Sequence, residues 1–116
     1  MLSADQTDNL ASGSTWLVKR HLEQGGSLTP VQVRTYLESF DCVTDWAAQL
    51  HFCQSIQFLE ITAMDAKAVA SWLQIQLTHD RPFLRAWALD GLCRLALQHA
   101  EFEDSARAAL LEAQQD

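Results

Sequence analysis

The sequence has few basic residues. Eight lysines and arginines stand among fifteen aspartates and glutamates, which gives a formal net charge of −7. A nucleic-acid-binding module needs a clustered basic face, and these scattered basic residues do not supply one. The same acid excess disfavours anionic membrane surfaces. We therefore expect no nucleic acid and no membrane among the partners, whereas another protein with a basic patch suits the charge.

The chain also lacks long apolar runs and a regular cysteine pattern. No stretch approaches the roughly 18 apolar residues of a membrane-spanning helix. The first residues contain no basic segment followed by an apolar run, so we expect no secretory leader. The three cysteines are odd in number, and Cys53 and Cys93 fall in apolar helical stretches, whereas Cys42 stands in a turn. This usage predicts core thiols and a cytoplasmic location.

Glycine, proline and β-branched residues are scarce, whereas alanine, leucine, glutamine and glutamate are abundant. This bias favours helix over strand. No alternating apolar pattern and no Asn-Gly hairpin turn occurs, so no strand is expected. With 116 residues, 48% of them hydrophobic, the chain has the size of one domain, and we expect a single helical-repeat domain over residues 1–116.

Start and stop signals divide the chain into six expected helices. Gly25 and Gly26 end the first helix, which has Leu10 and Leu17 on its inward face. Thr29 and Pro30 open the second helix as N-cap and first helical residue. The first helix is expected from about Asp5 or Asp8 to Gln24, and the second from Thr29 through Phe40. The third is expected to begin after Thr44 or Asp45, the fourth after Thr62, and the fifth after Asp80 as its cap. The sixth is expected from about Phe102 to Gln115.

The helices match one another at an offset of 36 residues. This length is ten turns of about 3.6 residues, so one uninterrupted helix would also match itself. Here the breaks between helices repeat as well, which indicates a helical solenoid with two helices in each repeat. The aligned positions are Leu17, Cys53 and Leu89; Val33 and Val69; Tyr36 and Trp72; Leu37 and Leu73; Ile56 and Leu92; and Leu59 and Leu95.

The segment from Asp80 to Leu97, DRPFLRAWALDGLCRLAL, resembles the first helix of a HEAT repeat. It has an acidic, proline-bearing turn, then an arginine, then Ala-Leu and further leucines at helical spacing; these are Asp80, Pro82, Arg85, Ala88, Leu89, Leu92 and Leu95. Residues 44–61 form a poorer copy, with Gln49 where Arg85 stands. The resemblance implies an all-α fold, a short right-handed α-α superhelix of about six antiparallel helices of HEAT or armadillo type.

The same resemblance implies a function. HEAT-like units present a surface to another protein and have no catalytic activity of their own, so we expect a protein-interaction or scaffolding module. In these units the equivalent of Arg85 bonds an acid or a carbonyl of the neighbouring turn, which gives Arg85 and Asp80 a structural role. Asp80, Asp90 and Glu60 are the candidate partners of Arg85.

Helical phase separates the expected core from the expected partner surface. Trp72, Leu89 and Leu92 are expected in the core. Trp87 packs between layers or anchors a partner. Leu111 has no later element to cover it, which predicts weak self-association. The second helix of each pair lines the concave face in the family, so the remaining candidate partner contacts are Gln32, Thr35, Glu38, Lys67, Ser71 and Gln74.

No residue set indicates chemistry. Carboxylates at helix starts, such as Asp65, are explained as caps. His51 and Cys53 are two residues apart and point to nearly opposite sides of a helix, which disfavours a zinc site. No nucleotide-binding or hydrolase motif occurs. We therefore expect no catalytic residue, no metal and no cofactor. The alternative is a small α-helical enzyme or ligand-binding bundle whose pocket the sequence does not reveal.

The cysteine usage yields a first prediction. All three thiols should be free in the purified protein, because two of them belong to the core and the third to a turn. Alkylation without reductant, followed by mass spectrometry, should label each cysteine after denaturation. An intramolecular disulfide would overturn this expectation and the cytoplasmic location with it.

Overall fold

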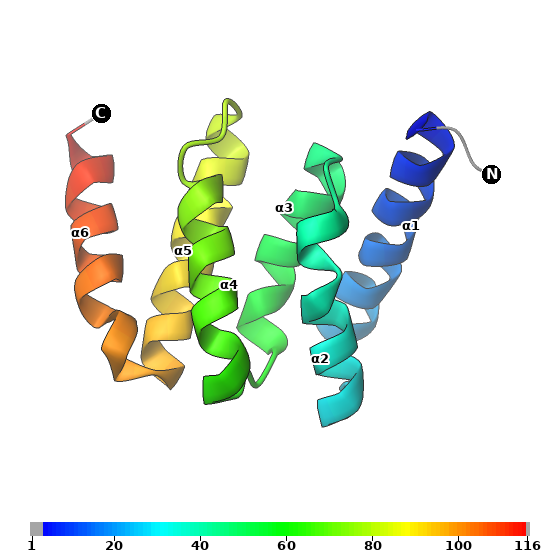
Figure 1. Ribbon diagram of the computed structural model, residues 1–116, viewed down its shortest axis with the longest axis horizontal. Helices are drawn as coiled ribbons and strands as arrows, with labels where there is room; N and C mark the ends of the chain where they lie inside the picture. Colours follow the sequence, from blue (N-terminus) through cyan, green and yellow to red (C-terminus); the bar gives the residue numbers. More distant parts are fainter. Residues whose placement is uncertain (1–3, 116) are drawn as a thin grey trace. The chain divides into compact units, whose positions relative to one another are not determined.

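The computed structural model describes the backbone of residues 4–115 and the side chains of residues 12–115. All regular secondary structure in that part of the chain is helical, with six α-helices and three short 3-10 turns (Figure 1). This confirms the all-α class. The chain divides into two compact units, one ending at Leu59 and one beginning at Glu60. The expected inward position of Leu10 lies outside the described side chains.

The first unit contains three α-helices. Consecutive helices run in opposite directions, and the first packs along the third (Figure 1). The two share a direction, with the second helix running against them. The elements are α1 (Ala4–Glu23), α2 (Pro30–Glu38), the 3-10 turn η1 (Phe40–Cys42), α3 (Trp46–Ser55) and the 3-10 turn η2 (Ile56–Phe58).

The end of α1 follows the expected glycine signal. The N–H of Gly26 donates to the carbonyl of His21 at 3.0 Å, and the N–H of Gly25 donates to the carbonyl of Leu22 at 3.1 Å. This pair of bonds is a Schellman motif, which needs a left-handed residue. Gly25 supplies it with a φ of 89°. A side chain at position 26 would also collide with the His21 ring.

Side-chain caps begin α2 and α3. Thr29 accepts from the N–H of Gln32 at 3.2 Å, and the Gln32 side chain accepts from the N–H of Thr29 at 2.9 Å. This reciprocal pair is the expected capping box. Of the two residues considered for α3, Asp45 is the cap, since its carboxylate accepts from the N–H of Ala48 at 3.1 Å.

An aromatic cluster joins α2 and η1 to α3. The ring of Tyr36 lies 4.8 Å from that of Phe52 and 5.6 Å from that of Phe40, measured between centroids. Phe40 and Phe52 are 2% and 1% exposed. Aromatic pairs at these separations add about 0.5–1.5 kcal/mol each to the effect of burial. The cluster therefore ties the second helix of this unit to its third.

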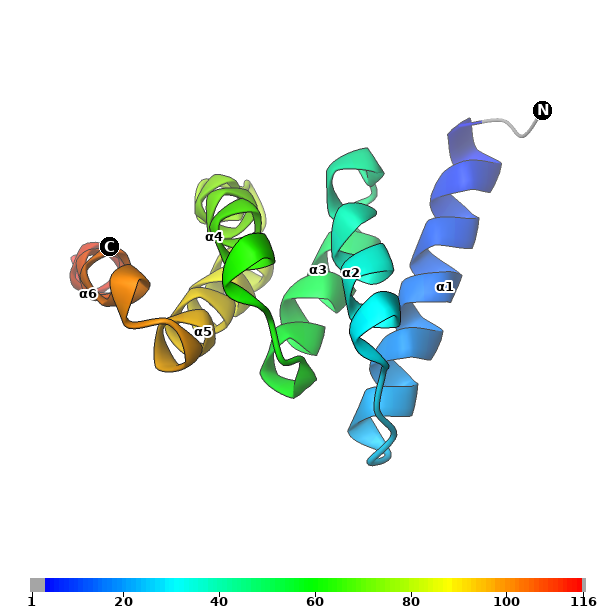
Figure 2. The same ribbon diagram turned by 60° about the horizontal axis from the view of Figure 1, so that its bottom comes forward.

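The second unit has α5 packed between two neighbours, α4 and α6, as Figure 2 shows. The segment before α4 is attached to the end of α5. There the N–H of Ile61 donates to Oε1 of Gln98 at 2.8 Å, and the His99 ring bonds the carbonyl of Ile61 at 2.5 Å. The elements are α4 (Ala63–Gln76), α5 (Pro82–Gln98), the 3-10 turn η3 (Ala100–Phe102) and α6 (Glu103–Gln114).

One expected N-cap of this unit is wrong, and another is the expected residue but lacks the side-chain bond to the backbone. Arg81, not Asp80, is the N-cap of α5, and it makes no side-chain cap bond. The reason is Pro82, which is the first helical residue and holds the residue before it in an extended conformation. At α4 the N-cap is Thr62 as expected, but its hydroxyl donates to the Asp65 carboxylate at 3.3 Å instead of accepting from the backbone.

Burial repeats at the 36-residue offset. When α2 and η1 are aligned with α4, and α3 with the residues after it is aligned with α5, buried residues stand at equivalent positions. The matched buried pairs are Val33 and Val69, Leu37 and Leu73, Phe40 and Gln76, Ala48 and Leu84, Phe52 and Ala88, Ile56 and Leu92, and Leu59 and Leu95. The chain thus uses one burial pattern twice.

The aligned set of Leu17, Cys53 and Leu89 does not share one environment. Cys53 is fully buried, Leu89 is half-buried and Leu17 is 63% exposed. Leu17 was expected inward, and that expectation is wrong. Thr15 is the buried residue that faces α3, and at about 100° per residue Leu17 lies on the opposite side of α1.

The expected burial of Trp72 and Leu92 is confirmed, whereas the expected full burial of Leu89 and the core position of Cys93 are corrected. Trp72 is 5% exposed and Leu92 is fully buried. Leu89, which was expected to be fully buried, is half-buried because one side faces a groove described below. Cys93 is half-buried as well.

A pair of substitutions tests whether Leu89 is less buried than Leu92. Leu92→Ala should lower the free energy of unfolding by about 2–5 kcal/mol, because it leaves a cavity in a closed core. Leu89→Ala should cost clearly less, about 1–2 kcal/mol, since water already reaches one side of Leu89. Urea titration followed by circular dichroism measures both. Equal losses would show that Leu89 belongs to the closed core after all.

Candidate functional site

The three helices of the second unit leave an open groove of about 340 Å³ beside the point where α4 ends and α5 begins. Its wall comes from the end of α4 and the turn after it, the first turns of α5 and the last turns of α6. The residues that line it are Gln74, Leu77, Thr78, Pro82, Arg85, Ala86, Leu89, Ala109, Glu112 and Ala113.

Small side chains create this groove. Ala86 on α5 faces Ala109 and Ala113 on α6, where longer side chains would fill the space. Leucine side chains form the rest of the apolar floor, and both Leu77 and Leu89 are half-buried. An apolar floor that water reaches is a place where contact with a partner is favourable, because burial of apolar surface gains about 25 cal/mol per Å².

Arg85 is held in place by the loop that joins α4 to α5. Its Nη1 donates to the carbonyls of His79 at 2.8 Å and Asp80 at 3.2 Å. These bonds match the expected contact with a carbonyl of the neighbouring turn. The carboxylates considered as partners do not take part. Asp90 instead accepts from Nε of Arg94 at 2.9 Å.

Arg85 and Glu112 line the same groove without pairing to each other. Neither forms an ion pair with any other described residue. Nε and Nη2 of Arg85 also have no acceptor within residues 12–115. Because the loop carbonyls fix Nη1, the guanidinium keeps its orientation, and little side-chain entropy remains to be lost on binding. The groove therefore offers a fixed cation and an exposed anion beside apolar side chains.

Gln49 repeats the role of Arg85 in the first unit. Its Nε2 donates to the carbonyl of Val43 at 3.3 Å, and both residues stand 36 positions before Arg85 and His79. The amide brings an acceptor that a guanidinium lacks. Accordingly Oε1 of Gln49 is buried and has no partner in the described part of the chain. The 36-residue alignment identified Gln49 as the equivalent of Arg85, but it did not predict that both side chains donate to a loop carbonyl.

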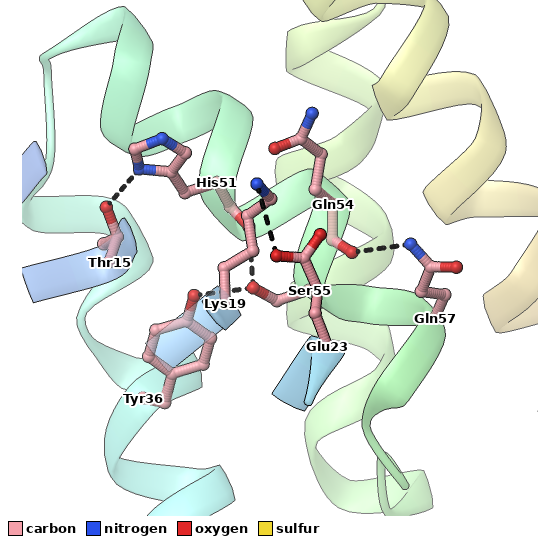
Figure 3. Close-up of polar contacts among 8 residues, drawn as sticks. All are labelled: Thr15, Lys19, Glu23, Tyr36, His51, Gln54, Ser55 and Gln57. Atoms are coloured by element: carbon pink, nitrogen blue, oxygen red, sulfur yellow. Dashed lines mark hydrogen bonds and ion pairs between the residues drawn. The ribbon is translucent and has the colours of Figure 1, made fainter. Parts of the chain in front are cut away.

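A line of polar contacts connects α1 and α3 in the first unit (Figure 3). The Thr15 hydroxyl donates to the carbonyl of Ser12 at 3.1 Å and lies 2.8 Å from Nδ1 of His51. Because the hydroxyl proton is used on Ser12, Nδ1 of His51 is the donor to Thr15. Burial lowers the pKa of His51, and the positive charge of Lys19 lowers it further.

Tyr36 and Ser55 make a second contact of this kind (Figure 3). The Ser55 hydroxyl donates to the carbonyl of His51 at 2.7 Å, so the Tyr36 hydroxyl, 3.0 Å away, is the donor to Ser55. Burial raises the pKa of Tyr36 well above its ordinary value. Ser55 is fully buried and its proton is engaged. This arrangement serves packing, and it gives a substrate no access to a nucleophile.

The expected partner contacts on α2 are all exposed, but two of their side chains are engaged locally. Gln32 belongs to the capping box, and the Thr35 hydroxyl donates to the carbonyl of Val31 at 3.0 Å. Only Glu38 keeps its side chain free of a hydrogen bond to the described residues. The α2 candidates thus offer less than their exposure suggests.

The candidates of the second unit fall into two groups. Lys67, Ser71 and Gln74 are exposed on α4, and only Gln74 reaches the groove. Trp87 is half-buried. Leu111 is 56% exposed as expected, yet it lies on the side of α6 away from Ala109 and Ala113.

Sequence reasoning missed several residues of the site. Ala86, Ala109, Ala113 and Glu112 were not selected, because alanines that leave a space look the same as alanines that fill one. The Thr15 and His51 contact was missed as well. Its only signal is that the two residues stand 36 positions apart on helices that the repeat aligns.

Further findings concern metals, membranes and relatives. Within the described part of the chain, no group of three or more His, Cys, Asp or Glu side chains is placed so that it could hold a metal ion. None of the described helices is long and apolar enough to cross a membrane. Comparisons with models of protein families, with curated proteins and with solved structures find no match to this chain.

The His51 contact predicts acid sensitivity. The lowered pKa means that the unfolded chain takes up a proton near pH 6.5 while folded His51 resists it. Stability should therefore be lost as the pH falls below about 6.5, until folded His51 is itself protonated, and above that pH no such penalty applies. The backbone of Ser12 and the charges of Asp45 and Glu23 raise the pKa of His51 and partly offset this lowering.

Thermal unfolding of the protein and of His51→Asn at about pH 7.5 and about pH 5.5 measures how much of the acid-induced loss of stability comes from His51. Asparagine keeps a donor near the Nδ1 position but does not titrate. The wild type should lose more stability than the variant between the two conditions. His21, His79 and His99 are common to both proteins and so cancel. An equal loss would show that His51 is not protected from protonation.

Proposed function

We propose that this protein is a protein-interaction module without catalytic activity of its own, and that it binds its partner through the groove of α4, α5 and α6. One observation carries the proposal. Arg85 and Glu112 line an apolar groove, and neither forms an ion pair with another described residue. Apolar contact supplies affinity, and charges at fixed positions select the partner and its orientation.

The proposal includes the HEAT-like character of the chain. Two features support it beyond the resemblance in sequence: burial at positions 36 residues apart, and the loop carbonyls bonded by Gln49 and Arg85 at equivalent positions. A repeat keeps such a contact because each unit must hold the turn that starts its first helix. In this interpretation Arg85 has a structural role and a binding role at once.

A groove walled by helices suits a helix or an extended segment of a partner protein. Such a segment would place an apolar side chain between Leu77, Leu89 and the alanines. An acidic group of the segment would meet Arg85 and a basic group would meet Glu112. We propose a cytoplasmic setting for this contact, consistent with the fact that Cys42, Cys53 and Cys93 form no disulfide.

Blocking the groove tests the proposal. Ala113→Trp places a large side chain in it, and Gln114→Trp places the same side chain one residue further, about 100° around α6. Both positions are exposed, so both variants should fold. In affinity capture from the native cell followed by mass spectrometry, a specific partner should be retained by the wild type and by Gln114→Trp and be reduced about tenfold or more by Ala113→Trp.

A different outcome would exclude the groove as the binding site. If every captured protein responds equally to the two tryptophan variants, binding occurs elsewhere or not at all. Circular dichroism of both variants first establishes that their helix content is unchanged. This check separates loss of binding from loss of structure.

A second candidate is a small-ligand site in the same groove. Its volume of about 340 Å³ lies at the lower end of the roughly 300–1,000 Å³ typical of ligand pockets. A ligand library screened by thermal shift against the wild type and Ala113→Trp would favour this alternative if stabilisation is seen only with the open groove.

A further inference from the structure

The groove of the second unit carries a pattern of charge that is complementary to itself. A cation from α5, Arg85, and an anion from α6, Glu112, line one groove together with apolar side chains, and neither forms an ion pair with a described residue. A twofold axis brings each residue of a surface against a different residue of the same surface. Two copies facing each other across such an axis bring Arg85 of each copy to Glu112 of the other.

We propose that the groove of α4, α5 and α6 binds the same groove of a second copy of this chain, with two reciprocal Arg85–Glu112 ion pairs. The inference rests on the proposed function of the groove and names the partner. Each guanidinium is already fixed by the carbonyls of His79 and Asp80, so its remaining donors can bind the second copy at little entropic cost. The apolar floor of Leu77 and Leu89 is covered on both copies at once.

The alanines allow this approach. Ala109 and Ala113 stand one turn apart on α6 and leave room along the helix for a helix of the second copy. Small residues at such positions permit close contact between backbones. Leu111 lies on the other side of α6, so the contact we infer differs from the end-to-end association that its exposure alone predicts.

The overall charge limits the strength of the contact. Two copies with a formal net charge of −7 each repel one another at long range. At an ionic strength of about 0.15 M this repulsion is screened beyond roughly 8 Å, whereas charges in direct contact are screened less. A weak, reversible dimer is therefore expected, and sedimentation equilibrium over a range of concentrations at that salt is the measurement.

Charge reversal with exchange tests the pairing directly. Glu112→Arg should weaken self-association about tenfold, since it sets two arginines against each other in both pairs. Arg85→Glu should do the same with two acids. An equimolar mixture of the two variants restores an arginine opposite an acid in both pairs, and it should associate as the wild type does. Arg107→Glu, on the far side of α6, changes the net charge by the same amount as Arg85→Glu and is the control for that variant; it should weaken association much less than Arg85→Glu does.

Arg85→Glu removes the loop bonds, so its helix content and its unfolding must be checked first. If this variant does not fold, Glu112→Arg measured alone against Arg107→Glu and Leu111→Glu still decides the matter. Loss with Glu112→Arg alone supports the inference. Loss with Leu111→Glu instead, equal behaviour of all variants, or a wild type that stays monomeric to about 1 mM overturns it.

The proposed function fails by a different result. A monomeric wild type whose partner is still lost with Ala113→Trp would overturn the reciprocal dimer and leave the interaction module intact. A dimer that Glu112→Arg weakens, without any groove-dependent capture of another protein, would support the dimer and restrict the proposed module to self-association.

Discussion

The bond between the Arg85 guanidinium and the two carbonyls of the α4–α5 loop is the contact on which the second unit depends most. A guanidinium is always charged, and a half-buried one must find acceptors. Backbone carbonyls supply them here at 2.8 and 3.2 Å, which holds the turn and sets the start of α5. One contact thereby positions the helix that α4 and α6 both pack against, and it orients the charge beside the groove.

The groove is a consequence of side-chain size. Arg85 and Leu89 occupy one side of α5, and across from them α6 presents Ala109 and Ala113. Had these alanines been leucines, the space would be core, and Leu89 would be buried. Because they are small, Leu89 retains an exposed side and Glu112 stands beside an apolar floor. The binding hypothesis depends on this difference of volume as well as on the charges of Arg85 and Glu112.

The first unit is specified in another way, through polar contacts at its helix junctions. Thr15, His51, Tyr36 and Ser55 exchange hydrogen bonds whose donors and acceptors are determined by the serine and threonine protons. Each bond adds about 1 kcal/mol, but an unmatched partner would cost more than that. Such bonds favour one register of α1 on α3 over others of similar apolar burial. The lowered pKa of His51 predicts that protonation at acid pH destabilises this contact.

The sequence by itself determined the features that depend on neighbours along the chain. The capping box at Thr29 and the glycine end of α1 were predicted because each is closed within a few residues. The phase of the main core stripe, including Leu92 and Trp72, followed from helical spacing in the same way.

Only the tertiary structure decided which apolar face meets another helix and which meets water. Leu17 and Leu89 carry the same periodic signal as Cys53, yet α1 turns Leu17 away from α3, and the alanines of α6 leave Leu89 beside a groove. The N-cap of α5 is Arg81 and not the expected Asp80, because Pro82 is the first helical residue; this is a local effect that the preference for an acidic cap does not include. Periodicity reports that a side chain is apolar, whereas burial depends on the size of residues from distant segments, and no single helix contains that information.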